Sequence, residues 1–243
     1  MKITCVIPSR YNSTRLPGKP LIEFFGKPMI WWVYNAVSKT KGLDKIIVAT
    51  DDDRILETCK KYNIPAIMTS QNHENCFHRL HEVSNIIKSD KYLLVNGDEP
   101  LIEPTVIQEV INKILETNPY FLFTYRHFSD PSEVMDSGNI KVVTSNNKLI
   151  YLSRIPIPYP HKSTLFQYKK IIGVQAFSKE ALDFFVNTPA GELEKIEDIA
   201  ELRWVENHKI VDCYKVNSKS ISVDNVRDIE RVVKIMKEDK YYG

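Results

Sequence analysis

Short apolar runs alternate with longer segments of helical periodicity along most of the chain. The runs are rich in β-branched side chains, as is typical of buried strands, whereas the longer segments place apolar residues on one helical face. This alternation predicts right-handed strand–helix–strand crossovers, and therefore an α/β fold with a doubly wound, mostly parallel sheet and helices on both faces. The predicted strands are Ile3 to Ile7, Lys45 to Thr50, Ile64 to Met68, Tyr92 to Asn96, Tyr120 to Tyr125, Ile171 to Phe177 and Ile210 to Val216. The predicted helices are Met29 to Ser38, a helix capped by Asp51 to Asp53 that runs to Tyr62, Phe77 to Lys88, Pro104 to Glu116, Lys179 to Val186, Leu193 to Asn207, and one that begins near Val226.

Residues 138–165 interrupt the alternation. Ile140 to Thr144 and Leu149 to Leu152 flank the pair Asn146 and Asn147, which is typical of a β-hairpin. The next segment, Arg154 to Pro160, is too rich in proline for a central strand or a helix. We therefore expect one domain over residues 1–243, with residues 138–165 as a hairpin and arm that pack on a partner subunit.

Composition narrows the class of protein. The chain has 243 residues, of which 43% are hydrophobic and 26% charged, as is ordinary for a globular protein that buries one large core. A net charge of +2 gives no general attraction to nucleic acid or to a membrane. The four cysteines follow no C-x-x-C or metal-ligand spacing, and no apolar run reaches membrane-spanning length. These features predict a cytoplasmic protein with reduced thiols and neither a nucleic-acid nor a membrane partner.

The loop after the first strand concentrates positive charge. Arg10, Arg15 and Lys19 stand close together there, with Gly18 and two prolines restricting the backbone. Crowded cations repel one another unless an anion lies among them, and guanidinium groups bind phosphate oxygens in pairs. A nucleoside triphosphate is therefore the favoured ligand, and a solvated basic loop is the alternative. The loop matches neither G-x-x-x-x-G-K-[ST] nor G-x-G-x-x-G.

Two carboxylates follow other strand ends. Asp98 comes after the fourth predicted strand, and Asp224 follows the apolar run Ser220 to Val223. Because ligands of open α/β sheets bind beyond the carboxyl ends of the strands, both should lie near the cationic loop. Mg²⁺ is usually held by one or two carboxylates together with substrate phosphates. The alternatives are a turn residue for Asp98 and a helix N-cap for Asp224.

Several motifs, in the right order along nearly the whole chain, together resemble the CMP-Kdo synthetases, which are the 3-deoxy-manno-octulosonate cytidylyltransferases. The matching segments are Ile7 to Tyr11, Arg15 to Leu21, Gly97 to Pro100, Ser153 to Tyr159, Leu193 to Glu197 and Ser222 to Asp224. This resemblance implies CTP-dependent transfer of CMP to the anomeric hydroxyl of a 2-keto-3-deoxy sugar acid, with release of pyrophosphate. It also implies a homodimer formed through the region Ile140 to Tyr159, and a place in lipopolysaccharide or capsule biosynthesis.

The resemblance assigns roles by position. The implied catalytic residues are Lys19, Arg15, Asp98 and Asp224, and the last two would hold Mg²⁺. The implied nucleotide-binding residues are Pro8, Ser9, Arg10, Ser13, Arg15, Lys19, Thr69, Ser70 and Arg79. The implied acceptor-binding residues are His78, Asn96, Arg154, Tyr159, Gln175, Glu194 and Glu197. The choice of CTP over UTP rests on the resemblance alone.

The sequence departs from the family pattern mainly where the acceptor is expected. The family's S-G-T-E-R-L-A-E is Asn75 to Glu82 here, and its Gln before G-D-E-P is Asn96. The family's R-H-x-G-x-Y reads Lys170 to Gln175. Because a site built to hydrogen-bond particular hydroxyls rejects analogues that lack them, the acceptor is Kdo or a related ulosonic acid, or else a different acid such as a sugar phosphate or a phosphonate. A CTP-binding protein without turnover is a third hypothesis.

Overall fold

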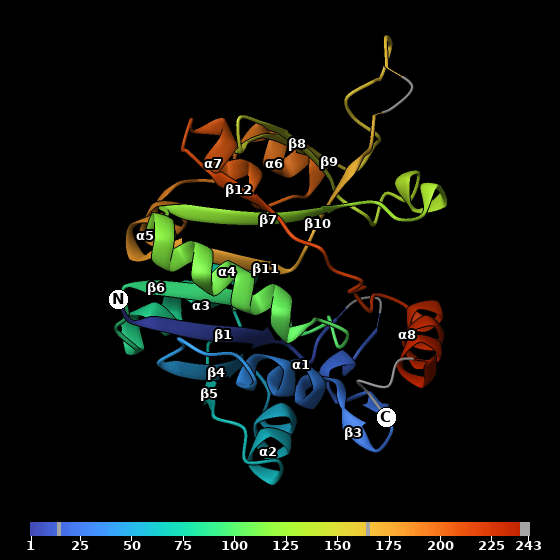
Figure 1. Ribbon diagram of the computed structural model, residues 1–243. Helices are drawn as coiled ribbons and strands as arrows, with labels where there is room; N and C mark the ends of the chain where they lie inside the picture. Colours follow the sequence, from blue (N-terminus) through green and yellow to red (C-terminus); the bar gives the residue numbers. More distant parts are fainter. Residues whose placement is uncertain (14–15, 164–165, 239–243) are drawn as a thin grey trace.

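A ten-stranded sheet runs through the computed structural model, which describes residues 1–13, 16–163 and 166–238 (Figure 1). The strand order is β10-β8-β9-β12-β7-β11-β6-β1-β4-β5, and β2 and β3 pair separately. The strands are β1 (Ile3–Ser9), β2 (Glu23–Phe24), β3 (Lys27–Pro28), β4 (Lys45–Thr50), β5 (Ala66–Met68), β6 (Lys91–Val95), β7 (Phe121–His127), β8 (Lys141–Ser145), β9 (Lys148–Ser153), β10 (Lys169–Ile171), β11 (Val174–Ser178) and β12 (Asp212–Lys215). The helices are η1 (Lys19–Leu21), α1 (Met29–Ser38), α2 (Asp53–Lys61), α3 (Cys76–Ile86), α4 (Pro104–Thr117), η2 (Pro131–Val134), α5 (Lys179–Asn187), α6 (Glu192–Glu197), α7 (Leu202–Glu206) and α8 (Val226–Glu238).

Helices cover both faces of the sheet, as predicted. In β1, the alternate residues Ile3, Cys5 and Ile7 enter one core together with apolar residues of α1, α2 and α4. Val6 points the other way, into a second core built from α3, α5 and α7. Since successive side chains of a strand point to opposite faces, a continuous apolar run is what a strand buried on both sides requires.

The prediction of a mostly parallel sheet holds for only half of the molecule. Strands β6, β1, β4 and β5 are parallel neighbours, and β7 pairs in parallel with β12. However, β11 lies antiparallel between β6 and β7, and β8, β9 and β10 pair antiparallel with their neighbours. The reason is that these strands are joined by a tight turn, a bulge and an arm instead of crossover helices.

The predicted strand Ile171 to Phe177 is interrupted. Ile171 pairs with Tyr125 and Ala176 with Leu122, so β10 and β11 both run along β7 with extra residues between them. The extra residues form a bulge around Gly173. A bulge bends its strand and turns backbone groups away from the ladder.

The long helix predicted from Leu193 to Asn207 is instead two short helices, α6 and α7. Asp198 ends α6 in the left-handed conformation, with φ of 51°, which aspartate tolerates better than most residues. The Arg203 guanidinium reaches back to the Glu194 carboxylate at 2.6 and 2.7 Å, which holds the two helices together. A buried tertiary contact therefore overrides the local helical pattern.

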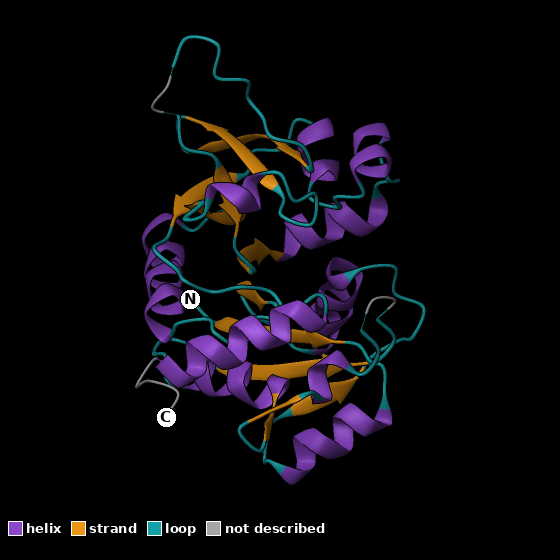
Figure 2. Cartoon of the chain, turned by 90° about the vertical axis from the view of Figure 1, so that its right-hand side faces the viewer, coloured by secondary structure: helices purple, strands orange, loops and turns teal. Residues whose placement is uncertain are grey.

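The predicted hairpin and cap are confirmed. Asn146 and Asn147 both have positive φ, as a two-residue turn between β8 and β9 requires. The Asp52 side chain accepts a hydrogen bond from the Arg54 backbone nitrogen at the start of α2. After β9, the chain leaves the body as a projecting arm (Figures 1 and 2). Within the described ranges, no helix is both long and apolar enough to cross a membrane.

Candidate active site

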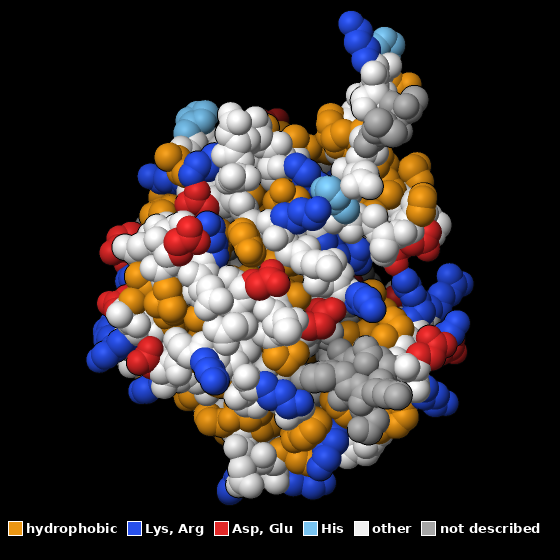
Figure 3. Space-filling model, viewed as in Figure 1, with side chains coloured by type: hydrophobic (Ala, Val, Ile, Leu, Met, Phe, Trp, Pro, Cys, Tyr) orange, Lys and Arg blue, Asp and Glu red, His pale blue; other side chains and the backbone are white. Residues whose placement is uncertain are grey.

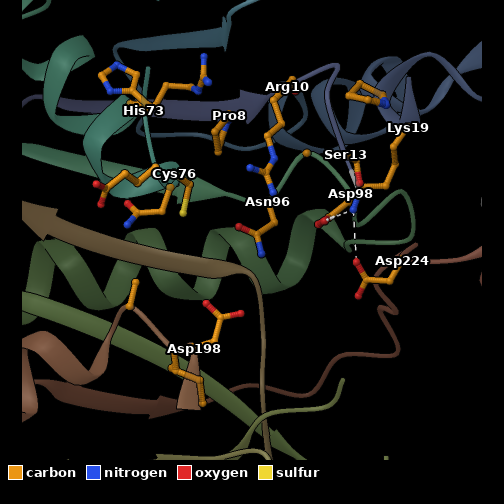
Figure 4. Close-up of a pocket in the computed structure, with 18 of the residues that line it drawn as sticks. Pro8, Arg10, Ser13, Lys19, His73, Cys76, Asn96, Asp98, Asp198 and Asp224 are labelled. Carbon is orange, nitrogen blue, oxygen red and sulfur yellow. Dashed lines mark hydrogen bonds and ion pairs between the residues drawn. The ribbon is translucent and has the colours of Figure 1, made fainter. Parts of the chain in front are cut away.

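An open cavity of about 560 Å³ lies beyond the carboxyl ends of β1 and β6 (Figure 4). One wall is the loop after β1, and the opposite wall is the segment from α6 to the start of α7. The start of α3 closes a third side. The lining side chains and backbone belong to Pro8, Ser9, Arg10, Ser13, Lys19, Pro20, His73, Glu74, Asn75, Cys76, Arg79, Asn96, Gly97, Asp98, Ala190, Glu194, Lys195, Asp198, Ile199, Ala200 and Asp224.

Gly97 allows the two strand ends to meet. A Cβ atom at this position would lie 2.7 Å from both the Pro8 carbonyl oxygen and Ser9 Oγ, closer than real Cβ contacts. Only glycine therefore lets the end of β6 press against the end of β1. This approach places Asp98 beside the loop that carries Lys19.

Lys19 lies between the two predicted metal-binding carboxylates. Its Nζ is 2.6 Å from Asp98 Oδ2 and 3.4 Å from Asp224 Oδ1, and the three side chains point toward one another in Figure 4. Burial alone would lower the pKa of Lys19, but the attraction of Asp98 and then of Asp224 outweighs it, so the pKa is raised. The lysine is therefore a permanent cation at the base of the cavity.

The carboxylate pair suits a divalent cation. Asp98 Oδ1 is buried and has no hydrogen-bond partner among the described residues, so one carboxylate oxygen is left for another ligand. Within the described part of the chain, no cluster of three or more His, Cys, Asp or Glu residues could hold a metal ion. Two carboxylates completed by substrate phosphate oxygens are the arrangement that Mg²⁺ usually takes. The donor set at Asp98 and Asp224 fits that ion.

The cationic loop is fixed by contacts within itself and with α2. The Gly18 backbone nitrogen donates to the Tyr11 carbonyl at 2.9 Å, which closes the loop on itself. The Arg54 guanidinium stacks 3.2 Å from the centre of the Tyr11 ring and is paired with Asp52. Arg10 is exposed and extends into the cavity. The predicted residue Arg15 lies outside the described residues.

The other predicted nucleotide-binding residues divide into two groups. Pro8, Ser9 and Ser13 line the cavity with Arg10 and Lys19. Arg79 also reaches it, although its guanidinium pairs with Asp51 at 2.7 Å and donates to Thr69 Oγ1 at 2.5 Å. Thr69 and Ser70 do not line the cavity; Thr69 supports Arg79, and the Ser70 nitrogen donates to Glu82. Their nucleotide-binding roles stay predictions.

Among the predicted acceptor-binding residues, Asn96 and Glu194 line the cavity. Gln175 is only 2% exposed and donates from Nε2 to Glu201 at 2.9 Å, beneath the cavity. His78 lies outside the cavity lining, with its ring 5.2 Å from that of Phe185, and burial lowers the pKa of its imidazole. Of these four, only the first two are placed to touch a ligand directly.

The remaining three predicted acceptor residues belong to the arm and its support. Arg154 donates to the Glu197 carbonyl oxygen, and the Glu197 carboxylate accepts from Ser153 Oγ at 2.7 Å and from the Arg154 nitrogen at 2.9 Å. Tyr159 is 82% exposed on the arm. None of Arg154, Glu197 and Tyr159 lines the cavity in this chain, and their acceptor-binding roles stay predictions.

Sequence reasoning missed part of the cavity lining, on the sides formed by α3 and by α6. His73, Glu74, Lys195 and Asp198 line the cavity but were not predicted to bind anything. Asn75, just before α3, accepts from the nitrogens of residues 77 and 78, and this N-cap was the available sign that a helix begins at the site. The place of Asp198 in the cavity lining could not be predicted, because it depends on the break between α6 and α7.

Known proteins with similar sequences are cytidylyltransferases. The family model described as cytidylyltransferase matches residues 4–215. The 3-deoxy-manno-octulosonate cytidylyltransferase of Fusobacterium nucleatum is 37% identical over 242 residues, with 98% of each chain covered. The 8-amino-3,8-dideoxy-manno-octulosonate cytidylyltransferase of Shewanella frigidimarina is 38% identical over 218 residues, which cover 86% of this chain and 89% of the relative.

A solved structure with a similar fold carries a related name. The structure of a CMP:2-keto-3-deoxy-manno-octonic acid synthetase complexed with CTP superposes with a TM-score of 0.92 at 31% identity. The superposition covers 98% of this chain and 99% of the other.

Proposed function

We propose that this chain, which belongs to the cytidylyltransferase family and within it to the 3-deoxy-manno-octulosonate cytidylyltransferases, transfers CMP from CTP to the anomeric hydroxyl of a 2-keto-3-deoxy sugar acid. The observation that carries the proposal is the cluster of Lys19, Asp98 and Asp224 at the base of the cavity. It joins a partly buried cation to two carboxylates where a triphosphate and a divalent cation would meet.

In the proposed reaction, the anomeric hydroxyl attacks the α-phosphorus of CTP. The hydroxyl loses its proton, a bond forms between the sugar oxygen and the phosphorus, and the bond to the bridging oxygen of pyrophosphate breaks. Lys19 and Arg15 would neutralise charge on the phosphates, and the backbone from Pro8 to Arg10 would hold the cytidine. Mg²⁺ bound by Asp98 and Asp224 would supply further neutralisation. Catalysis of phosphoryl transfer in general rests on such positioning and electrostatics.

The acceptor would lie against Asn96 at the end of β6 and against the segment from α6 to the start of α7; we call these together the acceptor wall. Asn96 and Lys195 offer a hydrogen-bond donor and a positive charge to an acidic sugar. The carboxylates of Glu74, just before α3, and Asp198, in the acceptor wall, would repel a doubly charged phosphate. We therefore favour a monocarboxylic ulosonic acid over a sugar phosphate or a phosphonate.

A second candidate acceptor is an ulosonic acid that carries an amine. Glu74 is exposed at the cavity, and Asp198, which also lines it, has a side chain that is 97% exposed and lies 3.4 Å from the Arg154 guanidinium. A protonated amino group between such carboxylates would be stabilised, whereas a neutral hydroxyl would gain less. The similarity to the Shewanella frigidimarina relative, whose name specifies an 8-amino sugar, supports this alternative.

An acceptor panel tests the proposal. The protein is incubated with CTP, Mg²⁺ and one acceptor at a time: 3-deoxy-manno-octulosonate, its 8-amino-8-deoxy analogue, a sugar phosphate or a phosphonate. Pyrophosphate release and a CMP-linked product, identified by mass spectrometry, are expected with at least one ulosonic acid. Turnover only with the sugar phosphate or the phosphonate would overturn the acceptor assignment. Binding of CTP without any product would instead support the hypothesis that the protein binds CTP but does not catalyse the transfer.

Asp98→Asn tests the metal assignment in the same assay. The substitution keeps the size of the side chain but removes the charge that would bind Mg²⁺, so the rate should fall at least ~100-fold. Asp212→Asn, at an exposed ion pair with Lys148 far from the cavity, is the matched control and should keep the full rate. An unchanged rate for Asp98→Asn would show that the metal is held elsewhere.

We further propose that the protein works as a homodimer and that the arm takes part in the contact. Ile155 and Tyr159 are 66% and 82% exposed. Large apolar side chains that stand together in water on one short segment often mark a contact with another protein. Hydrophobic side chains also gather at the base of the arm in Figure 3. A second copy of the chain would cover them.

A further inference from the structure

The buried carboxylate of Glu99 lies directly behind the site and has no role in the proposed reaction. Glu99 is only 4% exposed and follows Asp98 in the chain. Its Oε1 accepts a hydrogen bond from the Gly173 nitrogen, and its Oε2 accepts one from Ser220 Oγ, both at 2.8 Å. The two partners belong to two segments that are distant in sequence, and the Glu99 carboxylate joins them.

The first partner, Ser220, belongs to the segment that delivers Asp224. Between β12 and α8 this segment has no helix or strand of its own, so individual hydrogen bonds and apolar contacts with other segments hold it in place. The Val223 nitrogen donates to the Asp98 carbonyl at 2.9 Å, and Ser220 is tied to Glu99. The distance between the two proposed metal ligands therefore depends on the Glu99 carboxylate.

The second partner, Gly173, belongs to the bulge between β10 and β11. Its carbonyl oxygen accepts from the Asn96 nitrogen at 2.8 Å, so the bulge also holds the residue that faces the acceptor. A Cβ at position 173 would overlap Glu99 Oε1 and lie 2.5 Å from Asn96 Nδ2. Glu99 and Asn96 therefore pack directly against the bulge.

We propose that Glu99 is a positioning residue that joins the metal-binding pair to the acceptor wall. It touches neither substrate nor metal. Its two hydrogen bonds fix Asp224 relative to Asp98 on one side and Asn96 on the other. The acceptor half of this inference rests on the proposed function, whereas the metal half does not.

Two substitutions separate geometry from charge. Glu99→Asp keeps the charge but is one methylene shorter, so it cannot reach both partners. Glu99→Gln keeps the length: its amide oxygen can accept from the Gly173 nitrogen while its NH₂ group donates to Ser220 Oγ. If Glu99 acts through its two hydrogen bonds, Glu99→Asp should weaken metal binding, whereas Glu99→Gln should bind the metal nearly as well as the wild type.

The measurement is Mn²⁺ binding to the CTP complex, followed through the electron paramagnetic resonance signal of free Mn²⁺, with no acceptor present. Glu99→Asp should weaken Mn²⁺ binding about tenfold, as expected for the loss of one hydrogen bond to a charged group, and Glu99→Gln should stay within about threefold of the wild type. Equal losses in both variants, or no loss in Glu99→Asp, would overturn the proposal. In the acceptor assay, Glu99→Asp should also raise the acceptor KM more than it lowers kcat.

Two further variants guard against a general loss of structure. Glu103→Asp is the matched control, because Glu103 binds Ser218 Oγ and the Lys219 nitrogen on the same segment but has no contact with Gly173. It should change Mn²⁺ binding less than threefold, and an equal effect would contradict a special role for Glu99. Ser220→Ala removes one of the two bonds and should weaken Mn²⁺ binding even if Glu99→Asp does not fold. If no acceptor reacts yet Mn²⁺ binding follows this pattern, the proposed acceptor chemistry fails and the metal half of the inference stands.

Discussion

At the scale of single residues, the charges of the site determine what it can bind. Lys19, Asp98 and Asp224 were predicted to converge beyond strand ends, and the structure places both carboxylates within 3.4 Å of Lys19 Nζ. Local sequence sufficed for Lys19 and Asp98, since they follow β1 and β6, and the carboxyl ends of neighbouring parallel strands share one edge. The strand expected before Asp224 does not form at Ser220 to Val223, and hydrogen bonds to Asp98 and Glu99 hold that segment at the site instead. The side chain of Gln175 is buried against Glu201 and does not line the cavity, and its acceptor-binding role stays a prediction.

Lys19→Met should abolish most of the activity. Methionine has a similar length and no charge, so the triphosphate would lose a cation and the two carboxylates would face each other without one. Loss of one such electrostatic partner costs ~100- to 1,000-fold in kcat. Lys60→Met, at an exposed lysine on α2 that does not line the cavity, should change kcat less than about threefold under the same steady-state conditions. An equal loss in both variants would mean that total charge, and not the position of Lys19, matters.

Glu201 should make stability depend on pH. Its carboxyl is buried, and this raises its pKa in the folded protein, although the hydrogen bond from Gln175 partly opposes the shift. Folding therefore favours the protonated form, so this contribution is complete below the unfolded pKa and is lost as pH rises through the folded pKa. Glu201→Gln should gain stability relative to the wild type between pH 5 and pH 8 in urea unfolding. A constant difference across that range would contradict the argument.

At the scale of elements, regular repeats were predictable and interruptions were not. The helix over Met29–Ser38 and the hairpin with its Asn146–Asn147 turn depend on local pattern and turn chemistry, so the sequence predicts them well. The bulge at Gly173 and the break at Asp198 exist because Glu99, Asn96 and Arg203 bind backbone or side chains from other segments. Propensity carries no information about such contacts, and both interruptions lie beside the cavity.

Gly173→Ala tests the bulge. The added methyl group would overlap Glu99 and Asn96 in a packed region, which should cost ~1–3 kcal/mol of unfolding free energy. Gly138→Ala is the matched control, because the nearest atom to its Cβ would be the carboxylate of the exposed Asp136 at 3.1 Å. Thermal and urea unfolding of both variants measure the difference. Equal stabilities would mean that the bulge can relax around a side chain.

At the scale of the whole molecule, the cavity lies between two parts of one sheet that have different construction. The parallel strands carry the cationic loop and Asp98, whereas the antiparallel half carries α6, α7 and the arm. The aromatic cluster of Phe77, Phe177 and Trp204 packs behind the acceptor wall. The two sides of the cavity are therefore positioned by different parts of the fold.

The arm leads to a prediction about assembly. If a second copy covers Ile155 and Tyr159, light scattering should give twice the chain mass of 28.2 kDa, and Ile155→Asp should shift the protein toward the single-chain mass. A buried aspartate without a partner would destabilise the contact, whereas the same residue in a monomer would lie in water at little cost. Leu115→Asp, at a 49% exposed position on α4, is the control and should leave the mass unchanged. A wild-type protein of single-chain mass at micromolar concentration would contradict the dimer, and the exposed side chains of the arm would then require another partner.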